Sequence, residues 1–168
     1  ARTALALARE QLPQFAGICV GCLVWCLIQQ GETAAAEALF NDPATHEETQ
    51  QIFQFFDLSM ATILLNLAGG RPDDAVAAAR QAIEQLTDMG GRGWLPDFHH
   101  ALATALIAAG QPDEAAAQLG TAIDMARETG IRAALWHMLS DATALAARRG
   151  DPAAGDLRAA AAAEIDYV

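Results

Sequence analysis

The sequence predicts an all-α fold, a right-handed superhelix of antiparallel helix pairs that repeats about every 40 residues. Three observations lead to this prediction. Helix-breaking glycines recur at a nearly constant interval, since Gly31, Gly70, Gly110 and Gly150 are separated by 39, 40 and 40 residues. Apolar residues between them recur every three or four positions, the period of a helix and not of a strand. Each glycine is therefore expected to end one helix and to precede the next.

The residues after two of these glycines have the composition of a helix start. Gly70 and Gly110 are each followed, two positions later, by a proline and then by two acidic residues. Proline suits the first helical position, and acidic side chains favour the positive end of the helix dipole. Gly150 begins a weaker copy of the same turn, and Gly90 and Gly130 follow the first two turns by twenty residues. The register thus holds over a full period.

These signals predict nine helices. A capping box formed by Thr45 and Glu48, just after Pro43, supports the start of the fourth. The expected ranges, in order, are about 2–11, 14–30, 32–41, 44–68, 72–89, 95–109, 113–129, 132–149 and 153–165.

Composition excludes several classes of function. The chain of 168 residues is 53% hydrophobic and carries a formal charge of −11, which is the wrong sign for a surface that neutralises nucleic-acid phosphates. All ten basic residues are arginine, so a Walker, Schiff-base or kinase lysine is impossible within it. The abundance of alanine and arginine is what GC-rich codons produce, so we expect a bacterial source.

The three cysteines are expected to pack in the core. Cys19, Cys22 and Cys26 would share one stripe of a helix with neighbouring apolar residues, and no partner ligands for a zinc or redox motif are visible. An odd number of cysteines suits a reducing cytoplasm. The uncharged stretch 15–28 is shorter than the ~20 residues of a membrane span, so we expect a buried helix and no membrane insertion.

The chain is expected to be a single helical-repeat domain over 1–168, cut from a longer multidomain protein. Its two ends lie inside incomplete repeats, with no polar capping repeat at either one. Leu5, Leu7 and Leu12 would lack a preceding helix, and the apolar side of 153–165 would lack a following one. Self-association through these faces is therefore expected.

Small residues recur at matching places in the repeats. Ala103 and Thr143 lie midway along expected first helices, and alanines follow the turn glycines by five and by about twelve residues, at Ala75, Ala82, Ala115 and Ala122. By these marks the chain resembles the tetratricopeptide repeat. Its period near 40 and its turn Ala-Gly-Gln-Pro-Asp-Glu-Ala are more similar to the longer variant in large bacterial ATP-dependent LuxR-class regulators of the maltose-activator type. The resemblance covers nearly the whole chain.

The resemblance implies a concave face lined by the first helices. Placed as in that family, the residues thirteen, ten and nine positions before each turn glycine lie on this face, Asp57 among them. Asp97, His100, His137 and Asp141 would then converge on adjacent helices, together with Ser140.

Three interpretations of this cluster remain open. Carboxylates and imidazoles together suit zinc or nickel, provided three or four of them meet around the ion. They could instead bind the cationic groups of a peptide or small ligand. They could also form a solvated acidic groove without a dedicated ligand. We expect no metal and no cofactor.

Aromatic residues give a second set of candidates. Trp94, Phe98 and Trp136 could form a wall for a ligand, although large aromatics at helical spacing more often pack between repeats. Catalysis is not expected, because the only serines are Ser59 and Ser140 and neither lies in a nucleophile motif. The chain is predicted not to be an enzyme.

The predicted function is a non-catalytic sensor or protein-interaction domain of a bacterial transcription regulator, located in the cytoplasm. The resemblance implies a peptide, protein or small-molecule inducer as partner, with ATP-binding and DNA-binding modules elsewhere in the parent protein. An adaptor that binds a partner peptide, and a repeat domain attached to a signalling ATPase or cyclase, are the alternatives.

Overall fold

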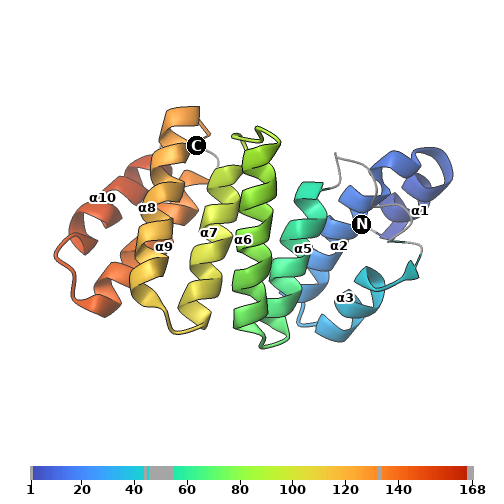
Figure 1. The fold of residues 1–168 in the computed structure, drawn as a ribbon, viewed down its shortest axis with the longest axis horizontal. Helices are drawn as coiled ribbons and strands as arrows, with labels where there is room; N and C mark the ends of the chain where they lie inside the picture. The colour runs from blue at the N-terminus through green and yellow to red at the C-terminus, as the bar shows by residue number, and fades with distance from the viewer. Residues whose placement is uncertain (1, 44, 46–54, 132–133, 166–168) are drawn as a thin grey trace. The chain divides into compact units, whose positions relative to one another are not determined.

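The computed structural model describes residues 2–43, 45, 55–131 and 134–165, and within them every regular element is helical (Figure 1). The predicted all-α class is therefore confirmed. The described elements are α1 (Arg2–Gln11), the short 3₁₀ helix η1 (Pro13–Phe15), α2 (Ala16–Gln29), α3 (Thr33–Phe40), α5 (Phe55–Ala68), α6 (Pro72–Asp88), α7 (Leu95–Ala108), α8 (Pro112–Thr129), α9 (Leu135–Arg149) and α10 (Ala154–Ile165).

Glycine ends six of these helices in the same way. The φ angles of the six lie between 68° and 77°, at Gly31, Gly70, Gly90, Gly110, Gly130 and Gly150. At each one, the N–H of the following residue donates to the carbonyl five residues earlier, over 2.8–3.0 Å. This backbone pairing satisfies carbonyls that the helix end would leave free, and its left-handed conformation disfavours side chains. The predicted turns are thus helix C-terminal caps.

Proline and acidic residues begin the helices as expected. Pro72 and Pro112 are the first residues of α6 and α8, and two acidic residues follow each of them. The third copy of the turn differs, because α10 begins only at Ala154 and the carboxylate of Asp151 accepts a hydrogen bond from the N–H of Ala153 at 2.9 Å.

The capping box predicted at Thr45 and Glu48 lies partly outside the described residues, as does the first part of the helix expected at 44–68. The hydroxyl of Thr45 donates to the carbonyl of Leu39 at 3.0 Å.

The chain divides into two compact units, Ala1–Ala78 and Ala79–Val168, each with its own apolar interior. In the first unit α2 contacts α1, α3 and α5. Its core includes Leu5, Val20, Val24 and Leu27. The expectation that Leu5 would be exposed is wrong, since this residue packs on α2, whereas Leu7 and Leu12 are half exposed.

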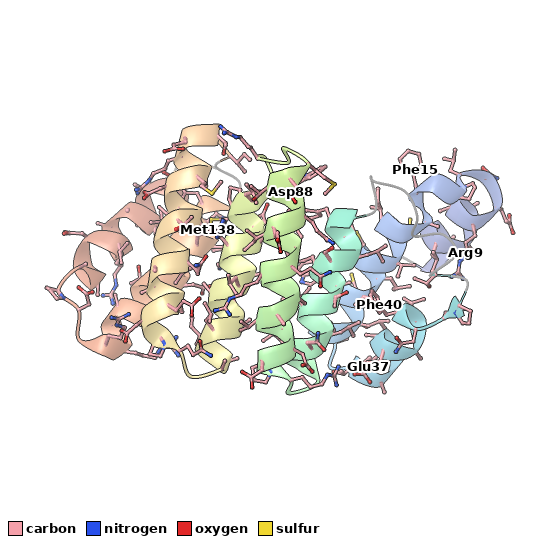
Figure 2. All side chains as sticks on the ribbon, in the orientation of Figure 1. Arg9, Phe15, Glu37, Phe40, Asp88 and Met138 are labelled. Carbon is pink, nitrogen blue, oxygen red and sulfur yellow. The ribbon has the colours of Figure 1, made fainter. Side chains whose placement is uncertain are left out.

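In the second unit α7, α8, α9 and α10 lie side by side, each packed on the next (Figure 1). The alanines that carry the repeat resemblance in this unit, Ala82, Ala103, Ala115 and Ala122, are all buried. Larger buried side chains complete the interior, among them Phe98. Met138, which is also buried, is labelled in Figure 2.

Arginines link helices at the polar ends of both units. In the first unit Arg71 donates to the Glu37 carboxylate of α3 at 3.3 Å (Figure 2). In the second, Arg149 at the end of α9 binds the Asp113 carboxylate at 2.7 Å and the Pro112 carbonyl at 2.9 Å, both at the start of α8. These exposed pairs orient helix ends more than they stabilise the fold.

Gly21 and Gly120 both lie well inside helices, but their surroundings are opposite in kind. A Cβ on Gly21 of α2 would lie 2.6 Å from the Cβ and 2.9 Å from the carbonyl oxygen of Asp57, so α2 and α5 approach as closely as they do only because this residue is glycine. A Cβ on Gly120 of α8 would meet no atom within 4 Å.

We predict that Gly21→Ala and Gly120→Ala have opposite effects on stability. The first forces α2 and α5 apart and should lower the free energy of unfolding by about 1–3 kcal/mol. The second adds helix propensity without a clash and should raise it by up to about 1 kcal/mol. Urea unfolding followed by circular dichroism measures both, and equal effects of the two substitutions would contradict this account of their packing.

Candidate functional site

Polar side chains of α7 and α9, at nearly equivalent positions of successive repeats, meet in the second unit. His100 of α7 and Asp141 of α9 are 41 residues apart, and the Nε2 atom of His100 lies 2.7 Å from the Oδ2 atom of Asp141. The two helices also share α8 as a neighbour. The two residues that the register was expected to bring together are thus hydrogen-bonded in the second unit.

Hydrogen bonding governs the charge of Asp141. The bond from His100 lowers the pKa of the Asp141 carboxyl, burial opposes this shift, and the charges of His100, His137 and Arg148 lower the pKa further. Asp141 is consequently ionised at neutral pH. His137 is four residues earlier on α9, a spacing that puts its side chain on the same face of the helix as Asp141.

Asp97 is the second carboxylate of the cluster. It lies in the first turn of α7, three residues before His100. Burial raises the pKa of its carboxyl, and the charge of His100 opposes this rise without cancelling it. Ionised Asp97 is therefore less well stabilised than Asp141, and an added cation would favour its charged form.

Trp136 borders this cluster on α9. Its ring is stacked on that of His137, with centroids 3.4 Å apart and planes inclined by 30°. Ser140 follows on the same helix and is exposed. The partly buried indole of Trp136 therefore contacts the cluster through His137, and the face of such a ring attracts organic cations.

The aromatic wall does not form as a unit. Phe98 is completely buried and belongs to the core of the second unit, as the packing interpretation held. Trp94 precedes α7 and is 43% exposed. Its ring lies near Gly91 in the turn after α6. Of the three aromatics, Trp136 is the one placed beside the polar cluster.

Asp57 lies in the first unit, in the first turn of α5 and against Gly21 of α2. Burial raises the pKa of its carboxyl. The charge of Asp57 in turn contributes, after burial, to raising the pKa of the Cys22 thiol. The surroundings of Asp57 are therefore α2, its own helix α5 and the Cys22 thiol.

The cysteine stripe is only partly in the core. Cys19 and Cys26 are partly buried, but Cys22 is exposed, and all three are free thiols. The prediction that the whole stripe would pack inside is wrong for Cys22, because the buried face of α2 is formed by Val20, Leu23, Val24 and Leu27.

Sequence reasoning also missed His99 and the apolar cavities. The Nδ1 atom of His99 lies 2.7 Å from the side-chain oxygen of Gln118, which joins α7 to α8. Cavities of about 190 Å³ and 300 Å³ lie in the second and first units respectively. The sequence signal for the smaller one is Gly120, a glycine inside a strongly helical segment.

Within the described residues, no three or more His, Cys, Asp or Glu side chains are grouped so that they could hold a metal ion. No helix in that part of the chain has the length and apolar character that crossing a membrane requires. No protein-family model matches the chain, and no curated protein matches it either.

We predict a small pairwise coupling between His100 and Asp141. Both side chains are partly exposed, at 22% and 52%, so the coupling in a double-mutant cycle of His100→Gln and Asp141→Asn should be about 0.2–1 kcal/mol at pH 6. A carboxyl with a lowered pKa in the folded state stabilises the protein above its unfolded pKa. This stability is lost as the pH falls through the folded pKa.

The coupling should therefore disappear on acidification to pH 2.5. Urea unfolding of the four proteins of the cycle at both pH values measures it. Asp124→Asn, an exposed substitution on α8 with the same change of charge, serves as the control in each titration. A coupling that persists unchanged at pH 2.5 would contradict the assigned hydrogen bond.

Proposed function

We propose that the chain is a tetratricopeptide-like solenoid, a right-handed superhelix of antiparallel helix pairs. The support is the regular spacing of its helix ends: from Gly70 to Gly150 a left-handed glycine follows a helix every 20 residues. Each pair of consecutive helices then makes one repeat of 40. Solenoids of this kind present extended surfaces built from equivalent positions of successive repeats.

The proposed function is a non-catalytic sensor and protein-interaction domain of a cytoplasmic bacterial transcription regulator of the LuxR class. It rests on the resemblance of the repeats and on a charge of −11, which suits partners other than nucleic acid. The ATP-binding and DNA-binding steps of such a regulator would belong to other modules of the parent protein.

The surface that we propose for recognition is the cation cluster, defined as Asp97, His100, His137 and Asp141. The observation that carries this proposal is the 2.7 Å contact between His100 and Asp141, because it joins equivalent helices of successive repeats at a polar point. Two carboxylates, one of them partly buried, and the neighbouring Trp136 ring fit an amine or guanidinium group of a peptide or small inducer.

Titration calorimetry with a blocked tri-lysine peptide tests this function. Asp97→Asn and Asp141→Asn should each weaken binding by roughly tenfold, the value of one charge-assisted contact. Asp124→Asn makes the same change of charge on α8 and should leave the affinity within about twofold.

Equal losses in all three variants would contradict the proposed site, because they would show that the peptide responds only to net charge. Retention of full affinity in Asp97→Asn and Asp141→Asn would contradict it as well. Circular dichroism of each variant verifies that the helices are intact.

A further inference from the structure

Two helices of the second unit are linked by an ion pair whose residues are not repeated forty positions later. Arg80 of α6 donates to the Glu114 carboxylate of α8 over 2.6 Å, and so links the two second helices of consecutive repeats. Forty residues later in the repeat, the equivalent positions are Gly120 of α8 and Ala154 of α10. Neither residue has a side chain that can reach across, so no such link joins α8 to α10.

The cavity of about 190 Å³ lies beside Gly120, the residue that replaces Arg80 of the ion pair. It is lined by α8, α9 and the start of α10, through Leu119, Gly120, Ile123, Leu145, Ala146 and Leu157 among others. Two buried leucines of α7, Leu102 and Leu106, are replaced at the equivalent places of α9 by Ala142 and Ala146, which also line the cavity. The space thus results from shortened side chains on two of its walls.

Gly120 keeps this space open at a cost. A glycine inside a helix is about 1 kcal/mol less favourable than alanine. Gly21 is explained by the close approach of Asp57, but a Cβ on Gly120 would have no neighbour within 4 Å. Packing within the described structure therefore gives no reason for this glycine, whereas a ligand that occupies the cavity does.

The charges at the rim indicate an uncharged ligand. Arg149 lines the cavity, but its guanidinium already binds the Asp113 carboxylate at 2.7 Å and the Pro112 carbonyl at 2.9 Å. Asp151 lines it too, and its carboxylate accepts the hydrogen bond from the N–H of Ala153. A charged ligand would have to compete with these partners. An uncharged ligand would not, and the apolar walls of the cavity suit it.

We propose that this cavity is a binding site for a small, uncharged, apolar molecule of about six to nine non-hydrogen atoms. Size supports this class, since an apolar cavity of roughly 150 Å³ accommodates benzene. The site uses none of the residues of the cation cluster, so it is a second recognition site on the same unit.

Fluorobenzene is a suitable probe, observed by fluorine NMR and by amide chemical shifts of the whole chain. Saturable shifts are expected at the amides of Gly120, Ile123, Leu145 and Ala146. Gly120→Leu fills the cavity and should weaken binding by at least about tenfold. Gly155→Leu is the matched control, because Gly155 lies on α10, a Cβ added there would meet no atom within 4 Å, and the residue does not line the cavity.

A second variant restores the link of the preceding repeat. The double substitution Gly120→Arg with Ala154→Glu should close the groove and abolish the fluorobenzene shifts while the protein stays folded. Benzoate and benzylamine should bind at least about tenfold more weakly than fluorobenzene, because the rim charges are already paired.

The proposal is overturned if fluorobenzene produces no saturable shifts in the cavity, or if Gly120→Leu and Gly155→Leu weaken its binding equally. It is also overturned if benzoate binds more tightly than the neutral probe. Binding of an apolar peptide side chain in place of fluorobenzene would overturn it too, since the groove would then be a protein-docking surface.

Discussion

The left-handed glycine that ends six of the helices is the constraint on which the rest of the structure depends. A helix leaves its last carbonyls without partners, and here the backbone itself satisfies them, through the N–H of the residue that follows each glycine. Because no side chain takes part in this pairing, the same turn can recur with different neighbours. The constant spacing of the glycines determines helix length, and helix length determines which residues meet across helices.

The contrast between the two units illustrates this dependence. In the second unit, α7, α8 and α9 each follow the twenty-residue spacing, and His100 meets Asp141 with an offset close to the period. In the first, α3 has only eight residues, from Thr33 to Phe40. There α2 and α5 contact each other directly, at the point where Gly21 lies against Asp57. The offset of that contact is shorter than the repeat, so a short second helix changes which residues of the first helices meet.

Local signals made much of the fold predictable. The ends of α6, α7 and α8 agree with expectation within one or two residues, because proline at a helix start and glycine after its end act within a few positions of the chain. Face assignments were less successful. Cys22 and Leu5 were misplaced because exposure depends on which neighbours cover a helix, and the pattern of one helix does not contain that information.

The same limit applies to the sites. The proximity of His100 and Asp141 follows from the register alone, so sequence reasoning could find it. The cavity beside Gly120 does not follow from the register in the same way, because the register tells which residues are equivalent but not how much space three helices together leave unfilled. Its sequence signals are the glycine inside a helical segment and the replacement of Arg80 and Glu114 by Gly120 and Ala154 at the equivalent positions.

The compact turns have a consequence for how such a protein can evolve recognition. In many folds, variable loops contact the ligand while a rigid scaffold holds them. Here the connection after Gly110 consists of a single residue, Gln111, before Pro112 begins the next helix, and its N–H is already used in the cap. A residue inserted between Gly110 and Gln111 would break that pairing, so this turn is too tight to contribute a ligand-binding loop. At such turns, diversity comes from exchanging side chains on the helix faces.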